Sequence, residues 1–176
     1  MTGLMSSWPK PARSLTNGSG EPVTGEVSTR DGHQGVAALR AFLTGDDDTF
    51  GQLSAHLQSR DGPGSGDTYA AMQAMTLTLA ARRRFGPAYT PGEVIRFVAQ
   101  VRAVLGDEVD PLTAERVLRG VLGDPVSAEG LDEHAKALAV PALLLVLVGQ
   151  EKLPGEDLET LLAQARVMAN HLLAEP

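Results

Sequence analysis

The sequence has no cysteine among its 176 residues. This absence excludes disulfide bonds, thiolate catalysis and cysteine-ligated zinc together. Aromatic residues make up only 4% of the chain, so the core must consist mainly of alanine, valine and leucine. Lysine is also rare, with 3 lysines against 12 arginines. The formal net charge is -7, which disfavours a general attraction to nucleic acid or to an anionic membrane.

The sequence also lacks a long uninterrupted apolar segment. Its longest apolar run, residues 137–149 (ALAVPALLLVLVG), is shorter than the roughly 20 residues that span a membrane. We therefore expect this run to form a central helix that is buried on all sides. Residues 1–20 show neither the basic start nor the apolar stretch of a secretory signal. A cytoplasmic location is the expectation that follows.

Apolar residues recur with helical spacing over most of the chain. Residues 1–32 are rich in serine, threonine, glycine and proline and show no such period, which predicts a poorly structured N-terminal tail. Residues 33–176 are predicted to form the helical domain. Its expected helices span residues 34–44, 46–59, 67–85, 91–105, 111–122, 132–148 and 156–173. The pattern predicts an all-α fold, a compact single-domain bundle of about seven helices with a long, buried, proline-containing central helix.

Several expected helix ends carry specific signals. Residues 90–93 (TPGE) read as a capping box with proline at the first helical position, and residues 110–111 (DP) repeat the device. Pro141 removes one backbone hydrogen bond from the central helix, so we expect that helix to kink or split there. The apolar stripes are expected to continue to Val104 and to Leu172 near the ends of their helices.

Two of these capped segments carry a resemblance. Residues 89–102 (YTPGEVIRFVAQVR) and 114–124 (AERVLRGVLGD) resemble segments of small all-helical proteins of GC-rich actinobacteria, a group with no known function. The resemblance extends over about residues 34–176 and implies an all-helical fold. It implies no catalytic residue.

The usual signatures of enzymes and metal sites are absent from the sequence. The four histidines, at positions 33, 56, 134 and 171, are far apart, and none belongs to an HExxH motif. The three aspartates at 46–48 lack the remaining ligands of a calcium loop, so we interpret them as helix-capping residues. The glycine-rich segment 62–67 (GPGSGD) ends in aspartate where a phosphate loop needs lysine, and GxSxG does not occur. We expect no enzyme activity, no metal and no cofactor.

Three consecutive arginines, Arg82, Arg83 and Arg84, stand at the end of one expected helix. Residues 82–119 hold seven arginines and five acidic residues, a balance of +2 in an acidic chain. We favour a solvated helix end with internal ion pairs, because cations stabilise the last helical turn and three consecutive side chains fan apart. A site for an acidic partner, or for the chain's own acidic C-terminal segment, is the second interpretation. Its candidate residues are Arg83, Arg84 and Arg96.

A nucleic-acid site is the third interpretation of the same segment. Two short helices joined by a few residues resemble a helix-turn-helix in outline. Their connection, residues 106–110 (GDEVD), carries three carboxylates, which would repel phosphates. We therefore do not expect nucleic acid as a partner.

These observations together predict a non-enzymatic helical interaction or regulatory module. The expected partner is another protein or a second copy of the chain in a homo-oligomer, and no membrane is expected. The alternative is a helical small-molecule-binding protein with an apolar pocket near the Pro141 helix. That pocket would be lined by Met72, Met75, Leu143 and Leu147.

Overall fold

The computed structural model describes residues 29–59 and 65–174, and these residues form α-helices without any β-strand. The predicted all-α fold is therefore confirmed. The helices are α1 (Thr29–Thr44), α2 (Asp47–Ser59), α3 (Ser65–Phe85), α4 (Pro91–Leu105), α5 (Pro111–Val121), α6 (Pro125–Ala128), α7 (Glu133–Glu151) and α8 (Gly155–Ala174), with a 3-10 helix, η1 (Gly106–Glu108), after α4. Seven of them correspond to the seven predicted helices. The single turn of α6 and the 3-10 turn were not predicted.

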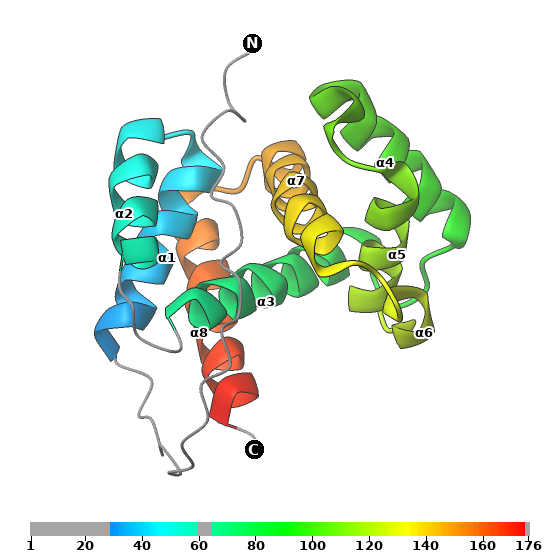
Figure 1. Ribbon diagram of the computed structural model, residues 1–176. Helices are drawn as coiled ribbons and strands as arrows, with labels where there is room; N and C mark the ends of the chain where they lie inside the picture. The colour runs from blue at the N-terminus through cyan, green and yellow to red at the C-terminus, as the bar shows by residue number, and fades with distance from the viewer. Residues whose placement is uncertain (1–28, 60–64, 175–176) are drawn as a thin grey trace.

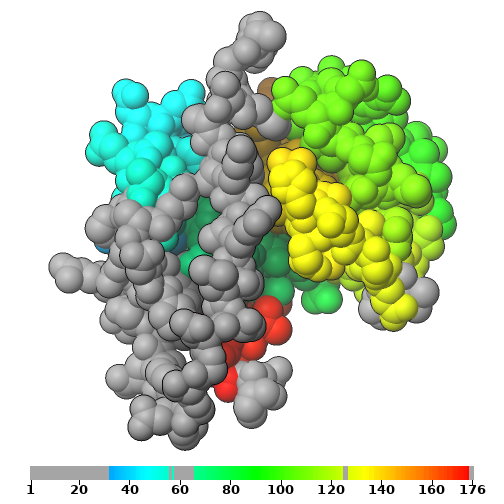
Figure 2. Space-filling model, viewed as in Figure 1, coloured from blue at the N-terminus to red at the C-terminus, as the bar shows by residue number. Residues whose placement is uncertain are grey.

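Two helices, α3 and α7, join the two sides of the bundle (Figure 1). Helices α1, α2 and α8 lie on one side, and α4, α5 and α6 lie on the other. The largest helix–helix interface is that of α3 with α8, and α3 also packs against α7 and α1. Helix α7 packs against α3, α5, α1 and α4. In the space-filling view, α1–α2 and α4–α5 accordingly appear on opposite sides of the molecule (Figure 2).

Helix α7 is the central helix that the sequence predicts. Eight of its residues are buried: Ala139, Pro141, Ala142, Leu143, Leu144, Val146, Leu147 and Val148. All of them except Pro141 share one core cluster with Phe97 of α4, Leu118 of α5 and Leu162 of α8. Of the described helices, α7 alone is long and apolar enough to cross a membrane, judged by length and composition. Its contacts on several sides are those of a core helix.

Of the two expected effects of Pro141, a kink or a split, the split does not occur, because α7 runs without interruption from Glu133 to Glu151. Proline lacks the N–H group that would bond to the carbonyl four residues earlier. That earlier residue is Ala137, which is exposed, so water can bond to the freed carbonyl. Pro141 itself is buried. Helix α7 thus gains the packing of the buried Pro141 side chain and lacks only the backbone hydrogen bond to the Ala137 carbonyl.

The first helix begins earlier than its apolar pattern predicts. Helix α1 begins at Thr29, four residues before the expected start of the helical domain at residue 33. Residues 29–32 (TRDG) contain no apolar side chain, so an apolar period could not reveal the first turn of α1. The rest of the predicted tail, residues 1–28, lies outside the described residues.

The expected inward positions of Val104 and Leu172 are wrong as well. Val104 is 66% exposed at the end of α4, and Leu172 is 51% exposed at the end of α8. Both lie in the last turns of helices whose earlier residues, such as Val101 and Ala169, are buried. Each of these two helices extends past the helices that pack against it. Its apolar stripe therefore continues into a last turn that no other helix covers.

The predicted N-caps form as expected. The Glu93 carboxylate reaches back to Thr90, accepting hydrogen bonds from the Thr90 amide at 2.7 Å and from its hydroxyl at 2.9 Å. Asp110 Oδ2 accepts from the Thr113 amide and from the Thr113 hydroxyl, both at 2.7 Å. These bonds satisfy N–H groups that have no partner within the helix itself. They fix where α4 and α5 begin, and therefore how the two helices present their side chains.

We expect Asp110→Ala to lower the free energy of unfolding by about 0.5–2 kcal/mol, since the Thr113 amide loses its acceptor.

Hydrogen bonds from the Thr113 hydroxyl and amide also hold the pKa of Asp110 below its ordinary value. A carboxyl whose pKa is lower in the folded state stabilises the fold above its unfolded-state pKa and loses that contribution as the pH falls. Asp110→Asn keeps an acceptor without the charge. Urea unfolding between about pH 5 and pH 3 should therefore show a smaller loss of stability for Asp110→Asn than for the wild type. Equal losses would contradict this role of Asp110.

Candidate functional site

The arginines predicted as candidates lie where α3 turns into α4. We call this region the arginine corner and define it by Arg82, Arg83 and Arg84 at the end of α3, residues 86–90, and Arg96 on α4. Gly86 ends α3 with a φ of +67°, a left-handed conformation that glycine adopts without strain. Its amide donates to the Arg82 carbonyl at 3.0 Å. The chain can therefore reverse direction within a few residues.

Three aromatic rings support the corner. The Phe85 ring lies edge-on to Phe97, with centroids 5.6 Å apart, and edge-on to Tyr89, with centroids 6.5 Å apart. Such edge-to-face pairs are favourable arrangements of aromatic rings. The chain contains only four phenylalanines, two tyrosines and one tryptophan, so this is an unusual concentration for the sequence. Because Phe97 is buried in the main core cluster, the rings anchor the corner to the interior.

Arg84 lies against this aromatic base. Its guanidinium carbon is 5.4 Å from the centroid of the Phe85 ring, which is within the range of a cation–π contact. The side chain is exposed, and among the described residues it has no ion-pair or hydrogen-bond partner. A guanidinium carries five N–H donors, and stacking on a ring uses none of them. Arg84 is therefore oriented by the protein while its donors remain free.

Arg96 and Arg84 both act on one carboxylate, that of Glu93. The pKa of Glu93 is lowered mainly by the hydrogen bonds from Thr90, and further by the charges of Arg96 and Arg84. Arg96 is exposed and, within the described ranges, forms no ion pair. Arg96 lies three residues after Glu93 on α4, whereas Arg84 lies at the end of α3.

Arg83 points elsewhere. Its Nε lies 3.2 Å from Glu151 Oε2 at the end of α7, and its Nη2 lies 3.4 Å from Asp157 Oδ2 in the first turn of α8. Arg83 thus joins three helix ends of its own chain. This is the internal pairing expected of a solvated helix end, and it separates Arg83 from the Arg84–Arg96 group. Consecutive side chains of a helix diverge by about 100°, which accounts for the difference.

The four residues of the expected apolar pocket fall into two groups. Leu143 and Leu147 are fully buried in the main core cluster. Met72 is also fully buried, but it belongs to a smaller cluster with Ala71 and Ala169, against which Met75 packs. The structure thus places the two methionines near the α3–α8 contact and the two leucines in the core around α7.

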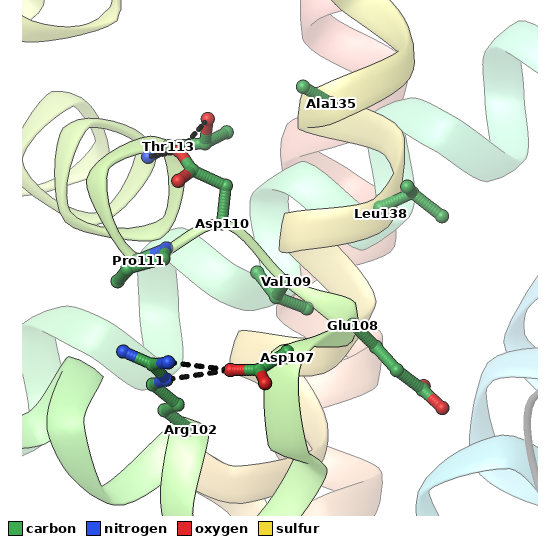
Figure 3. Close-up of a pocket in the computed structure, with 9 residues that line it drawn as sticks. All are labelled: Arg102, Asp107, Glu108, Val109, Asp110, Pro111, Thr113, Ala135 and Leu138. Carbon is green, nitrogen blue, oxygen red and sulfur yellow. Dashed lines mark hydrogen bonds and ion pairs between the residues drawn. The ribbon is translucent and has the colours of Figure 1, made fainter.

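A pocket of about 430 Å³ lies at a different place, between the α4–α5 connection and α7 (Figure 3). Its lining residues are Arg102, Asp107, Glu108, Val109, Asp110, Pro111, Thr113, Ala135 and Leu138. Asp107 points toward Arg102, with Oδ1 2.6 Å from Arg102 Nη2, and Asp110 points toward Thr113. Two of its three carboxylates are thus already paired within the chain. None of the four residues expected to line an apolar pocket, Met72, Met75, Leu143 and Leu147, lines this one.

The histidines and acidic residues do not assemble a metal site in the described part of the chain. There, no group of three histidine, aspartate or glutamate side chains is placed to hold a metal ion. His33 Nδ1 lies 3.1 Å from Arg166 Nη1, which joins α1 to α8. Asp46, the first of the three consecutive aspartates, accepts a hydrogen bond from the Thr49 amide at 3.1 Å and so caps α2.

Comparisons with models of protein families, with curated proteins and with solved structures find no match for this chain. The arginine corner is therefore interpreted from its own geometry. The sequence suggested Arg83, Arg84 and Arg96 as candidates, but it did not reveal the contact of Arg84 with the Phe85 ring. The sequence did contain a signal for the aromatic rings, because Phe85, Tyr89 and Phe97 flank the arginines in a chain with few aromatic residues.

Proposed function

We propose that this protein is a non-enzymatic interaction module whose arginine corner receives an acidic segment of a partner protein. The observation that carries the proposal is the pair of Arg84 and Arg96. Both side chains are exposed, come from different helices and have no ion-pair partner among the described residues, while Arg84 is oriented by Phe85. Exposed arginines on an aromatic support are well suited to bind carboxylates across an interface.

The distribution of charge supports the same function. The chain carries a net charge of -7, whereas residues 82–119 carry +2. An acidic partner would be repelled less by this segment than by the more acidic remainder of the chain. The same overall charge disfavours the phosphate backbone of nucleic acids. Charge complementarity thus favours a protein partner that docks in one orientation.

This function is tested by site-specific photo-crosslinking in the source organism. A photoreactive amino acid at Ala88, which is exposed within the corner, should capture a partner. The same amino acid at Asn170, exposed on α8, serves as the control position. The Arg84→Glu/Arg96→Glu variant should abolish capture at position 88, because both donors become repulsive carboxylates. Arg83→Ala should retain it, since Arg83 is engaged with Glu151 and Asp157.

Capture that is equal at positions 88 and 170, or that persists in the double variant, would contradict the proposed function. Thermal unfolding of each variant provides the control for folding. Exposed charge substitutions away from the core usually change stability by less than about 0.5 kcal/mol. A loss of capture without a loss of stability therefore assigns the effect to the corner itself.

A further inference from the structure

We infer that the pocket between the α4–α5 connection and α7 binds a primary alkylammonium group, from a free amine or from a lysine side chain. This pocket has a volume of about 430 Å³, and no residue of the arginine corner lines it. The inference therefore goes beyond the proposed function and does not depend on it.

Part of the pocket lining is apolar. Val109 is 7% exposed and belongs to the main core cluster, and Ala135 and Leu138 of α7 also line the pocket. In Figure 3, Val109 lies between Asp110 and Glu108 on the connection, with the two α7 residues on the neighbouring helix. Pockets of about 300–1,000 Å³ with apolar walls and a few polar groups are the usual sites for small ligands. The hydrocarbon stem of a ligand can therefore bury its surface here.

The charge of the lining favours a cation. The lining contains three carboxylates and one guanidinium, so its net charge is -2. Arg102 Nη2 lies 2.6 Å from Asp107 Oδ1 and offsets the charge of that carboxylate. Asp110 accepts hydrogen bonds only from the uncharged hydroxyl and amide of Thr113 at 2.7 Å, and no cation of the described residues pairs with it or with Glu108. The charges of Asp110 and Glu108 thus attract a cation to the pocket and repel a phosphate or a carboxylate.

An organic cation matches the pocket better than a metal ion does. In the part of the chain that the structure describes, no three acidic or histidine side chains are placed to hold a metal ion. A metal ion also gains nothing from the apolar surface of Val109 and Leu138. An alkylammonium uses both parts of the lining, because its N–H groups donate to carboxylate oxygens while its stem covers apolar surface.

The experiment is a titration of the isotope-labelled full chain with n-butylammonium chloride at constant ionic strength, followed by NMR of the backbone amides. We expect saturable shifts at Glu108, Val109, Ala135 and Leu138. Methylammonium should bind at least about fivefold more weakly, because burial of each CH₂ group strengthens binding by up to about fourfold. 1-Butanol, which has the same stem without the charge, should produce no saturable shifts at these residues.

Two variants remove charge from the pocket and keep the helix cap. Glu108→Gln should weaken butylammonium binding roughly two- to fivefold. Asp110→Asn, which keeps an acceptor for the Thr113 amide, should weaken it by a similar factor. Glu156→Gln is the matched control, since it makes the same change of charge in the first turn of α8 and outside the pocket lining, and it should bind as the wild type does. Unchanged amide shifts in the rest of the spectrum show that each variant is folded.

An unchanged affinity of both pocket variants, or an equal loss in Glu156→Gln, would overturn the inference. Equal shifts with 1-butanol, or the absence of saturable shifts with butylammonium, would overturn it as well. Displacement of butylammonium by an equal concentration of calcium ions would contradict the assignment to an organic cation. Two further ligands identify the source of the group. Tighter binding of spermidine than of Nα-acetyl-lysine amide assigns it to a free polyamine, and the reverse order assigns it to a lysine of another protein; either order supports an alkylammonium site.

Discussion

Leu144→Asp is expected to unfold the protein. Leu144 lies in the middle of α7 and is 0% exposed, within the cluster that joins α7 to α3, α4, α5 and α8. An aspartate there is surrounded by apolar side chains and has no partner for its charge. The cost of burying such a group is several kcal/mol, comparable to the whole stability of about 5–15 kcal/mol of a typical domain.

The loss should be visible as an absent or strongly lowered thermal transition in circular dichroism. Ala137→Asp on the same helix is the matched control, since Ala137 is exposed and its substitution should leave the transition nearly unchanged. A soluble Leu144→Asp variant with the melting temperature of the wild type would show that α7 is not the core helix.

Gly120→Val is expected to destabilise the protein by about 1–3 kcal/mol through overpacking. A Cβ at Gly120 would lie 2.8 Å from the Ala128 Cβ, closer than two such carbons approach in proteins. The α5–α6 unit has little freedom to adjust, because Arg116 Nε bonds to the Ser127 carbonyl at 2.7 Å and Arg119 pairs with Asp124 at 2.8 Å. Glycine is thus needed at this close approach of α5 and α6.

A double-mutant cycle checks the cause of this loss. Ala128→Gly removes the methyl group that the new side chain meets, so Gly120→Val/Ala128→Gly should recover part of the stability lost in Gly120→Val. Urea unfolding of the four proteins measures the coupling. Strict additivity of the two substitutions would show that contact with Ala128 is not what excludes a side chain at position 120.

Signals that act within a few residues made the helices predictable. The caps at Thr90 and Asp110 involve neighbours three residues away, so the sequence alone contains both partners of each bond. The start of α1 at Thr29 carries no such signal in its side chains, and its position was misjudged. The prediction that Pro141 splits α7 was wrong for a related reason. A rule based on proline alone does not consider the residues that pack around its ring or the exposure of Ala137.

The candidate site was predictable as a set of residue types but not as a geometry. The proximity of Glu93 and Arg96 follows from their spacing of three residues on one helix. The edge-to-face contact of Phe85 with Phe97 depends on how the chain turns between α3 and α4. The pairing of Arg83 with Glu151 and Asp157 spans more than 60 residues of sequence. No spacing rule connects residues that far apart.

The large interface between α3 and α8 affects how the chain folds during its synthesis. Of the described helices, α8 is synthesised last, and it supplies Leu158, Leu161 and Leu162 to the core. Until these residues have left the ribosome, the side of α3 that packs against α8 is exposed to solvent. A nascent chain that ends before Gly155 therefore exposes apolar surface to chaperones and to other chains. The core is therefore complete only once the twenty residues of α8 are available to pack against α3.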